Sequence, residues 1–238
     1  STITADNQFH VAGIGGCLYG RVMMEGCENS GEYVKMTLGT ATNRICTGGL
    51  VGRLASRSYS DDKNTADNLL SVKDCTNNAD VYSTISTSHK LENHIGGAIG
   101  LTYSYGSTLS TFSFDNVDNY GSVISNTKAY SDTNARTWVG GIIGTTYISG
   151  SNSNANKCPF TINNCDNGRK GDNSKMLNVT GGMHYYTYVG GMIGYTVFPV
   201  TSNNCSNHMQ YLCDAKSINK YTYYGGFTGK LTHLAGIS

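Results

Sequence analysis

Short apolar segments alternate with polar, glycine-containing segments along the whole chain, and one apolar pattern recurs six times. Each copy is a six-residue block rich in glycine, and the last glycine of the block is residue 16, 52, 100, 144, 194 or 229. Recurrence at intervals of 35 to 50 residues indicates a repeat protein with insertions of variable length. The blocks read VAGIGG (11–16), TGGLVG (47–52), IGGAIG (95–100), VGGIIG (139–144), VGGMIG (189–194) and YGGFTG (224–229).

A second pattern lies between successive glycine blocks. It has a cysteine or valine at its centre, among Asn, Asp and Glu, with an asparagine two residues later. The central residues are Cys27, Cys75, Val117, Cys165 and Cys205. The asparagines are Asn29, Asn77, Asn119, Asn167 and Asn207. Five occurrences at one fixed offset indicate one structural position in each unit.

The segments of each unit are typical of β-strands. They are short, rich in Val, Ile, Thr and Tyr, and bounded by Gly, Asn, Asp and Ser, and no segment has the 3.6-residue period of a convincing helix. Three such strands in each unit predict an all-β fold, a parallel β-helix (β-solenoid) of about six coils with irregular loop insertions. Residues 1–238 then form a single repeat domain, with units that start near 11, 47, 95, 139, 189 and 224.

Stacking of the units predicts two columns of equivalent residues. The asparagines should form a ladder in which each amide bonds to the next, at the strand spacing of about 4.8 Å. The glycine blocks should stack in one sheet, with a second column of Ile14, Leu50, Ala98, Ile142, Met192 and Phe227. The insertions should leave the coil as surface loops at Arg53–Leu70, Thr145–Lys157 and Gly168–Thr187.

The glycine block resembles the GLUG motif of secreted and cell-surface bacterial repeat proteins. Residues Gly49-Leu50-Val51-Gly52 match that motif literally, and the Asn-Cys-x-Asn run at Asn164–Asn167 is also similar to the family. The resemblance covers the chain from about Val11 to Gly229. It implies an extracellular stalk or adhesive role and supplies no catalytic residues.

Composition restricts the classes of partner. Charged residues are 14% of the chain, against about 25% in an ordinary soluble domain, and the net charge is +1. There is no Lys/Arg run for nucleic acid and no apolar stretch for membrane insertion. Together with the cysteine content, these features favour a secreted or cell-surface protein. Two sequons, at Asn178 and Asn204, are candidate glycosylation sites.

The eight cysteines fall into two groups. Cys27, Cys75, Cys165 and Cys205 share one repeat position and should stack as thiols or bridge in adjacent pairs. Cys17, Cys46, Cys158 and Cys213 lie outside that register and are the disulfide candidates, with the connectivity left open. No Cys-x-x-Cys occurs, so we expect no metal site.

Catalytic motifs are absent from the sequence, and we expect no enzyme and no cofactor. His89 and His94 lack the spacing of a zinc protease. The carboxylates that a sugar-cleaving enzyme would need are confined to Asp61, Asp62, Asp115, Asp118 and Asp172. Each lies in a turn-like segment, where Asp most often bonds the local backbone.

Tyrosines are dense late in the chain, at Tyr185, Tyr186, Tyr188, Tyr221, Tyr223 and Tyr224. They are candidate contacts for a glycan or a partner protein, or they pack across strands. Trp138 directly precedes a glycine block, which favours packing at a corner of the coil. We therefore expect a structural or adhesive extracellular protein that stacks on itself head to tail or joins neighbouring domains of a longer surface protein. Carbohydrate binding or cleavage on a β-helix is the alternative.

Overall fold

The structure is a computed structural model and describes residues 8–41, 43–56, 68–88, 92–105, 110–127, 135–149, 158–180, 186–214 and 221–232. Every regular element in these ranges is a β-strand. A search of the same ranges finds no helix that is long and apolar enough to cross a membrane. The prediction of an all-β fold is therefore confirmed.

The strands form four sheets, and all recorded strand pairs are parallel. Sheet A contains β1 (Phe9–Ala12), β6 (Arg44–Gly48), β10 (Glu92–Gly96), β14 (Arg136–Gly140), β19 (Tyr186–Gly190) and β24 (Tyr221–Gly225). Sheet B contains β2 (Gly15–Tyr19), β7 (Val51–Ala55), β11 (Ile99–Ser104), β15 (Ile143–Ile148), β20 (Ile193–Thr196) and β25 (Thr228–Leu231).

Sheets C and D complete each unit. Sheet C contains β3 (Val22–Glu25), β4 (Glu28–Asn29), β8 (Asn68–Asn77), β12 (Ser110–Asn119), β16 (Phe160–Asn163), β17 (Asp166–Asn167), β21 (Val200–Asn203) and β22 (Ser206–Asn207). Sheet D contains β5 (Tyr33–Ala41), β9 (Asp80–Ser88), β13 (Val123–Thr127), β18 (Met176–Thr180) and β23 (Gln210–Asp214). Each of the first five units thus contributes strands to four sheets in the order A, B, C, D, and the expectation of three strands per unit is wrong.

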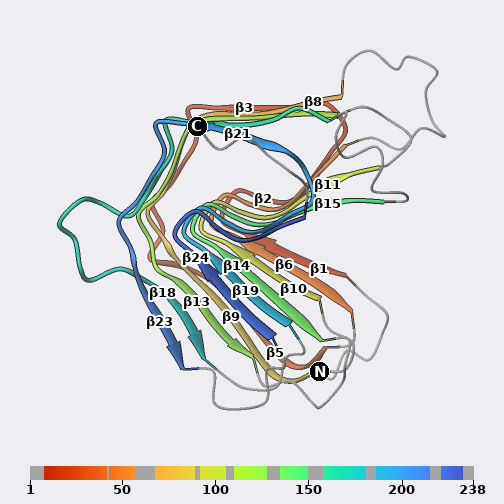
Figure 1. Ribbon diagram of the computed structural model, residues 1–238. Helices are drawn as coiled ribbons and strands as arrows, with labels where there is room; N and C mark the ends of the chain where they lie inside the picture. Colours follow the sequence, from red (N-terminus) through yellow and green to blue (C-terminus); the bar gives the residue numbers. More distant parts are fainter. Residues whose placement is uncertain are drawn as a thin grey trace.

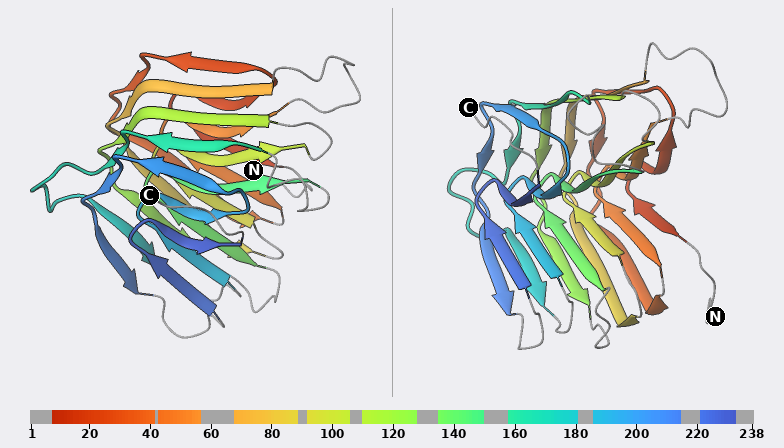
Figure 2. Two further views of the ribbon diagram at one scale, coloured as in Figure 1. Left: turned by 45° about the horizontal axis from the view of Figure 1, so that its top comes forward. Right: turned by 45° about the vertical axis from the view of Figure 1, so that its right-hand side comes forward.

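Sheets A and B meet at a sharp bend that lies inside the corner formed by sheets C and D (Figure 1). The turned views in Figure 2 show the strands of each sheet stacked in chain order, from red to blue. One core lies between B and C, where Leu54 and Ile99 pack with Phe112 and Phe160. A second core lies between A and D, where Ile95 and Val139 pack with Val123.

Each glycine block straddles the bend between sheets A and B, so the prediction that the blocks stack within one sheet is wrong. The central residues still form one backbone-bonded column, because Ile14 N–H donates to Leu50 O and Leu50 N–H donates to Ala98 O. The column continues through Ile142 and Met192 to Phe227. Its interior members are buried, whereas Ile14, in the first unit, is 47% exposed.

A second corner, within sheet C, depends on a left-handed backbone at one residue of each unit. This residue comes directly before the central cysteine or valine of the second pattern. Its members are Gly26 (φ 64°), Asp74 (φ 49°), Asn116 (φ 55°), Asn164 (φ 52°) and Asn204 (φ 52°). Gly, Asn and Asp are the residues that tolerate this conformation best, which explains the composition of the column.

The predicted insertions include residues that belong to strands. Arg53–Ala55 belongs to β7, and Thr145–Ile148 belongs to β15. Strand β18 lies inside the third predicted insertion and pairs with both β13 and β23. Residues 57–67, 150–157 and 181–185 of these segments lie outside the described residues.

Candidate functional site

The five repeat asparagines form one continuous hydrogen-bonded column at the corner between sheets C and D. Nδ2 of Asn29 donates to Oδ1 of Asn77 at 2.9 Å, and Nδ2 of Asn77 donates to Oδ1 of Asn119 at 2.9 Å. The column continues from Asn119 to Asn167 at 2.9 Å and from Asn167 to Asn207 at 2.7 Å. Asn77, Asn119 and Asn167 are fully buried. The ladder therefore satisfies the amides inside the molecule, where an unpaired polar group would be costly.

Each ladder asparagine packs against the backbone of one glycine block. A methyl group added at Gly13 would overlap Asn29, and one added at Gly49 would overlap Asn77. The same overlap relates Gly97 to Asn119, Gly141 to Asn167 and Gly191 to Asn207. The two repeated patterns of the sequence therefore make one contact, in which glycine is needed because the amide lies directly over its Cα.

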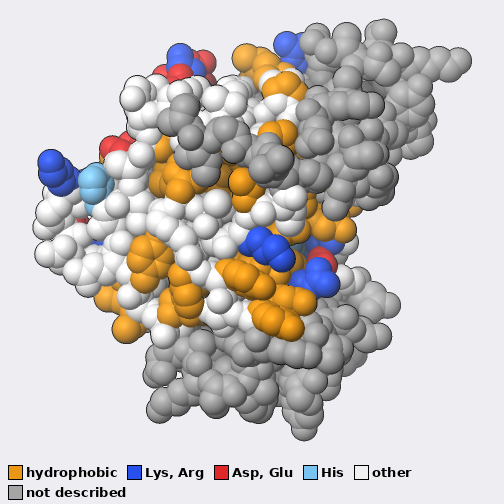
Figure 3. Space-filling view, in the orientation of Figure 1, with side chains coloured by type: hydrophobic (Ala, Val, Ile, Leu, Met, Phe, Trp, Pro, Cys, Tyr) orange, Lys and Arg blue, Asp and Glu red, His pale blue; other side chains and the backbone are white. Residues whose placement is uncertain are grey.

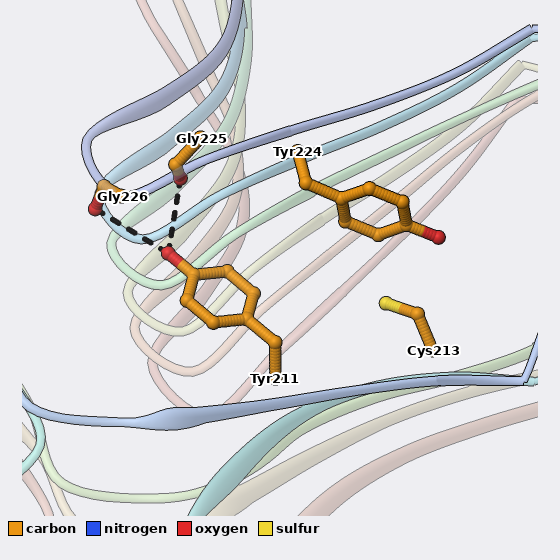
Figure 4. Close-up of a pocket in the computed structure, with 5 residues that line it drawn as sticks. All are labelled: Tyr211, Cys213, Tyr224, Gly225 and Gly226. Carbon is orange, nitrogen blue, oxygen red and sulfur yellow. Dashed lines mark hydrogen bonds between the residues drawn. The ribbon is translucent and has the colours of Figure 1, made fainter.

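The ladder ends at Tyr211, whose bonds to Gly225 and Gly226 are drawn in Figure 4. Nδ2 of Asn207 donates to the Tyr211 hydroxyl at 3.2 Å, and that hydroxyl bonds to Gly225 O at 3.0 Å and Gly226 O at 3.3 Å. Burial raises the pKa of Tyr211 to about 12, so the phenol stays protonated and can donate. The tyrosine ring borders a pocket of about 480 Å³ with Cys213, Tyr224 and the two glycines.

Stacked aromatic rings lie on the opposite face of sheet A, which points toward sheet B; we call this packed region between the two sheets the A–B interior. His94 and Trp138 stack with ring centroids 4.4 Å apart, and Tyr188 and Tyr223 stack at 5.1 Å. The register places these four residues in one column. Trp138 and Tyr188 are about 5% exposed and Tyr223 is 36% exposed, so the column opens only in the last unit.

Charged groups lie among these rings. The Arg44 guanidinium lies 5.4 Å from the Tyr147 ring centroid and pairs with Glu92 at 2.7 Å. Burial alone would raise the pKa of Glu92, but His94 and Arg44 lower it to about 2. Burial lowers the pKa of His94 to about 4, so the imidazole is neutral at pH 7. The A–B interior is thus packed and contains the Arg44–Glu92 ion pair.

The late tyrosines do not form one patch. Four of them stack on the face of sheet A that points into the A–B interior: Tyr186, Tyr188, Tyr221 and Tyr223. The ring centroids of Tyr186 and Tyr221 are 5.2 Å apart. Tyr224 points to the other side of sheet A and borders the end pocket. Tyr185 lies outside the described residues.

The repeat-position cysteines stack as thiols beside the core between sheets B and C. The Cys27 N–H donates to the Cys75 sulfur at 3.4 Å, and the Val117 N–H donates to the Cys165 sulfur at 3.4 Å. The Cys205 thiol donates to Ile162 O at 3.3 Å. Burial raises the pKa of Cys75, which keeps this thiol neutral.

The disulfide candidates do not pair, because all eight cysteines are free. Cys17 is exposed on β2, while Cys46 is buried in the A–B interior beside Leu101. Cys158 lies in the B–C core, and Cys213 borders the end pocket. The disulfide prediction is therefore not supported. Cys158 and Cys213 lie in different cores, whereas Cys17 lies close enough to Cys46 to affect its pKa, with both thiols free.

The candidate carboxylates make local or neighbouring-unit contacts. Asp115 accepts from Asn164 Nδ2 at 2.8 Å, and Asp118 accepts from the Tyr120 hydroxyl at 2.8 Å. Asp172 accepts from the Ser174 N–H at 2.9 Å. The described ranges hold no group of three or more His, Cys, Asp or Glu side chains arranged for a metal ion. Asp61, Asp62 and His89 lie outside those ranges.

The two sequon asparagines have different environments. Asn178 lies in β18, paired on both sides, and not in a surface loop as expected. Asn204 is exposed at the left-handed corner, and its Nδ2 donates to Asn164 Oδ1 at 3.3 Å. Asn204 is therefore the more accessible acceptor of the two.

The sequence pattern revealed the ladder and its glycines but not their end at Tyr211. That residue lies outside both repeated patterns, and only its position four residues after the last ladder asparagine could have suggested a contact. Comparisons with known proteins find no matching family model, no similar curated protein and no similar solved structure.

Proposed function

We propose that this protein is a parallel β-helix of about six coils that serves as an extracellular structural or adhesive element, with copies stacked head to tail. The observation that carries the proposal is the unbroken asparagine column, which runs through all five C–D corners and stops at the two ends of the stack. Placement outside the cell rests on the low charge content and on the resemblance to GLUG repeat proteins. The proposed role needs no cofactor and no catalytic group.

Both ends of the stack expose residues whose column neighbours are buried. Ile14 is 47% exposed in the first unit, although Leu50 in the same column is fully buried. Tyr224 is 48% exposed in the last unit, although Val189 in its column is fully buried. Figure 3, which views the molecule from its C-terminal end, shows hydrophobic side chains uncovered on this face with Lys and Arg beside some of them. Open parallel edges with uncovered apolar residues favour end-to-end association.

Head-to-tail stacking predicts that charges at the ends abolish assembly while charges on the sides do not. We expect the native chain to elongate with concentration in size-exclusion chromatography with light scattering, and to form fibres in negative-stain images. Ile14→Lys and Tyr224→Lys should each give monomers, because a lysine in a closed junction would be desolvated without a partner. Thr111→Lys is the matched control, since Thr111 is exposed on β12 in the middle of the stack and its neighbour Phe112, not Thr111, faces the core. A native chain that stays monomeric at high concentration would contradict the proposal.

A second candidate function is carbohydrate binding at the exposed end of the A–B interior, in the last unit. Tyr221 and Tyr223 are 40% and 36% exposed, and the Lys230 ammonium lies 5.3 Å from the Tyr223 ring centroid. Exposed rings beside a cation suit a sugar ring that carries an acidic group. Glycan-array binding that is lost in Tyr223→Ala and retained in Tyr33→Ala, which changes an exposed tyrosine on sheet D, would support this role.

A further inference from the structure

The sixth glycine block lacks the contact that the other five blocks make. Gly13, Gly49, Gly97, Gly141 and Gly191 each lie under a ladder asparagine. At the equivalent Gly226, a methyl group would meet nothing within 4 Å. Gly226 therefore has the geometry that elsewhere receives an asparagine, but no asparagine of the described residues lies over it.

The reason is an uneven end to the stack. Sheets A and B contain strands from six units, whereas the described strands of sheets C and D come from five. Strands β24 and β25 thus extend one level beyond β22 and β23, which form the last described level of sheets C and D. The pocket of about 480 Å³ lies at this step, between Tyr211 and Cys213 on β23 and Tyr224 on β24.

The pocket has the properties of an unfilled strand position. The described residues that line it include no charged side chain, and the two tyrosines and the cysteine among them offer a largely apolar surface. Along the described chain, β23 pairs with β18 on one side and has an open edge on the other. The Tyr211 hydroxyl accepts from Asn207, as a sixth amide would, and it donates to the carbonyls of Gly225 and Gly226.

We propose that this pocket is a docking site for an extended segment of another molecule that repeats the pattern of β8 and β9. The segment adds in parallel beside β22 and β23, places alternate apolar side chains against Tyr224, and sets an asparagine over Gly226. That asparagine accepts from Asn207 Nδ2 and donates to the carbonyl two residues after it in the segment, as Asn77 and Asn119 do, and the Tyr211 side chain moves aside. The proposal rests on the coil arrangement in the proposed function, and strand addition of this kind derives its affinity from backbone hydrogen bonds.

The test uses a labelled synthetic peptide with the sequence of residues 68–88, which contains β8, the corner and β9. Fluorescence anisotropy with the full chain should show saturable binding. The same peptide with Asn77→Ala should bind about tenfold more weakly or worse, since the Asn207 amide, which the docked peptide covers, then lacks its acceptor. Equal affinity of the two peptides would overturn the proposed asparagine contact.

Gly226→Ala separates docking from folding. The added methyl group meets open space in the free protein, so the melting temperature should be unchanged. In the docked state the methyl group would overlap the incoming amide, as it would at the five covered glycines, and peptide binding should be lost. Undiminished binding to Gly226→Ala, or no binding to the native chain, would reject the site.

The outcomes also distinguish this site from head-to-tail assembly. A monomeric native chain that binds the peptide in a Gly226-dependent way would sustain the docking site and reject self-stacking. Fibres formed equally by the native chain and by Gly226→Ala, without peptide binding, would sustain self-stacking and reject the docking site.

Discussion

Each ladder asparagine uses its amide as donor and acceptor at once. Asn119 donates to Gly121 O at 2.8 Å and to Asn167 Oδ1 at 2.9 Å, and it accepts from Asn77. Asp has the same shape but offers no donor when it is ionised. The requirement for asparagine is therefore set by hydrogen-bond polarity in a buried position.

Asn119→Asp should lower the free energy of unfolding by about 1–3 kcal/mol, because two donor bonds are lost and a carboxylate is buried. Chemical denaturation at neutral pH measures the loss. Asn29→Asp is the matched control: Asn29 occupies the same column at the partly exposed end of the ladder, and water can replace its partners there. An equal loss in both variants would show that burial in the ladder is not the cause.

The relation between elements shows what the sequence could and could not reveal. Strand-like segments and fixed offsets predicted parallel stacking, since period and spacing are local properties of the chain. The division of each unit into four sheets was missed because the glycine block reads as one apolar segment. Its bend follows from the packing of Asn77 against Gly49, which are 28 residues apart in the chain. The stacking of the aromatic rings was also missed, because His94, Trp138 and Tyr188 come from three units that are far apart in the sequence.

The burial of His94 between sheets A and B predicts a loss of stability in mild acid. His94 has an ordinary pKa of 6.5, and burial lowers it to about 4 in the folded chain. Between these values the unfolded state binds a proton that the folded state does not, so stability falls as the pH drops from about 6.5 to about 4. The shift corresponds to about 3 kcal/mol, and His10, whose pKa is also lowered to about 4, adds to the same window.

Thermal unfolding of the native chain and of His94→Phe across this pH range tests the assignment. Phe keeps an aromatic ring against Trp138 but does not titrate, so the variant should lose less stability between pH 6.5 and pH 4. Parallel pH profiles for the two proteins would show that His94 does not cause the loss. Glu92 titrates in a lower window, since its folded pKa is about 2.

The whole molecule is held together by contacts between successive units. Register pairs join each strand to its equivalent in the next unit throughout the described chain. In such a stack the stability of each unit depends on its neighbours, and the end units have a neighbour on one side only. The exposed Ile14 and Tyr224 mark these two ends.

Hydrogen exchange should therefore be slowest in the middle of the stack. We expect amides of β8, β12 and β16 to exchange more slowly than those of β3 and β21 in the same sheet, because opening of an end unit breaks one interface. Mass spectrometry of peptic fragments measures the difference. The ends should gain protection when the chain assembles or binds the peptide, and uniform exchange along the stack would argue for all-or-none opening.

The repeated path of the chain also aligns the strand ends in two rows. The ends of β7, β11 and β15 lie side by side in sheet B, and the ends of β9, β13 and β18 lie side by side in sheet D. Rungs of a parallel sheet are about 4.8 Å apart, so equivalent strand ends are held at that spacing along each row. Each additional unit adds one more strand end to each row. The number of units therefore sets the length of both rows, while the spacing within them stays fixed.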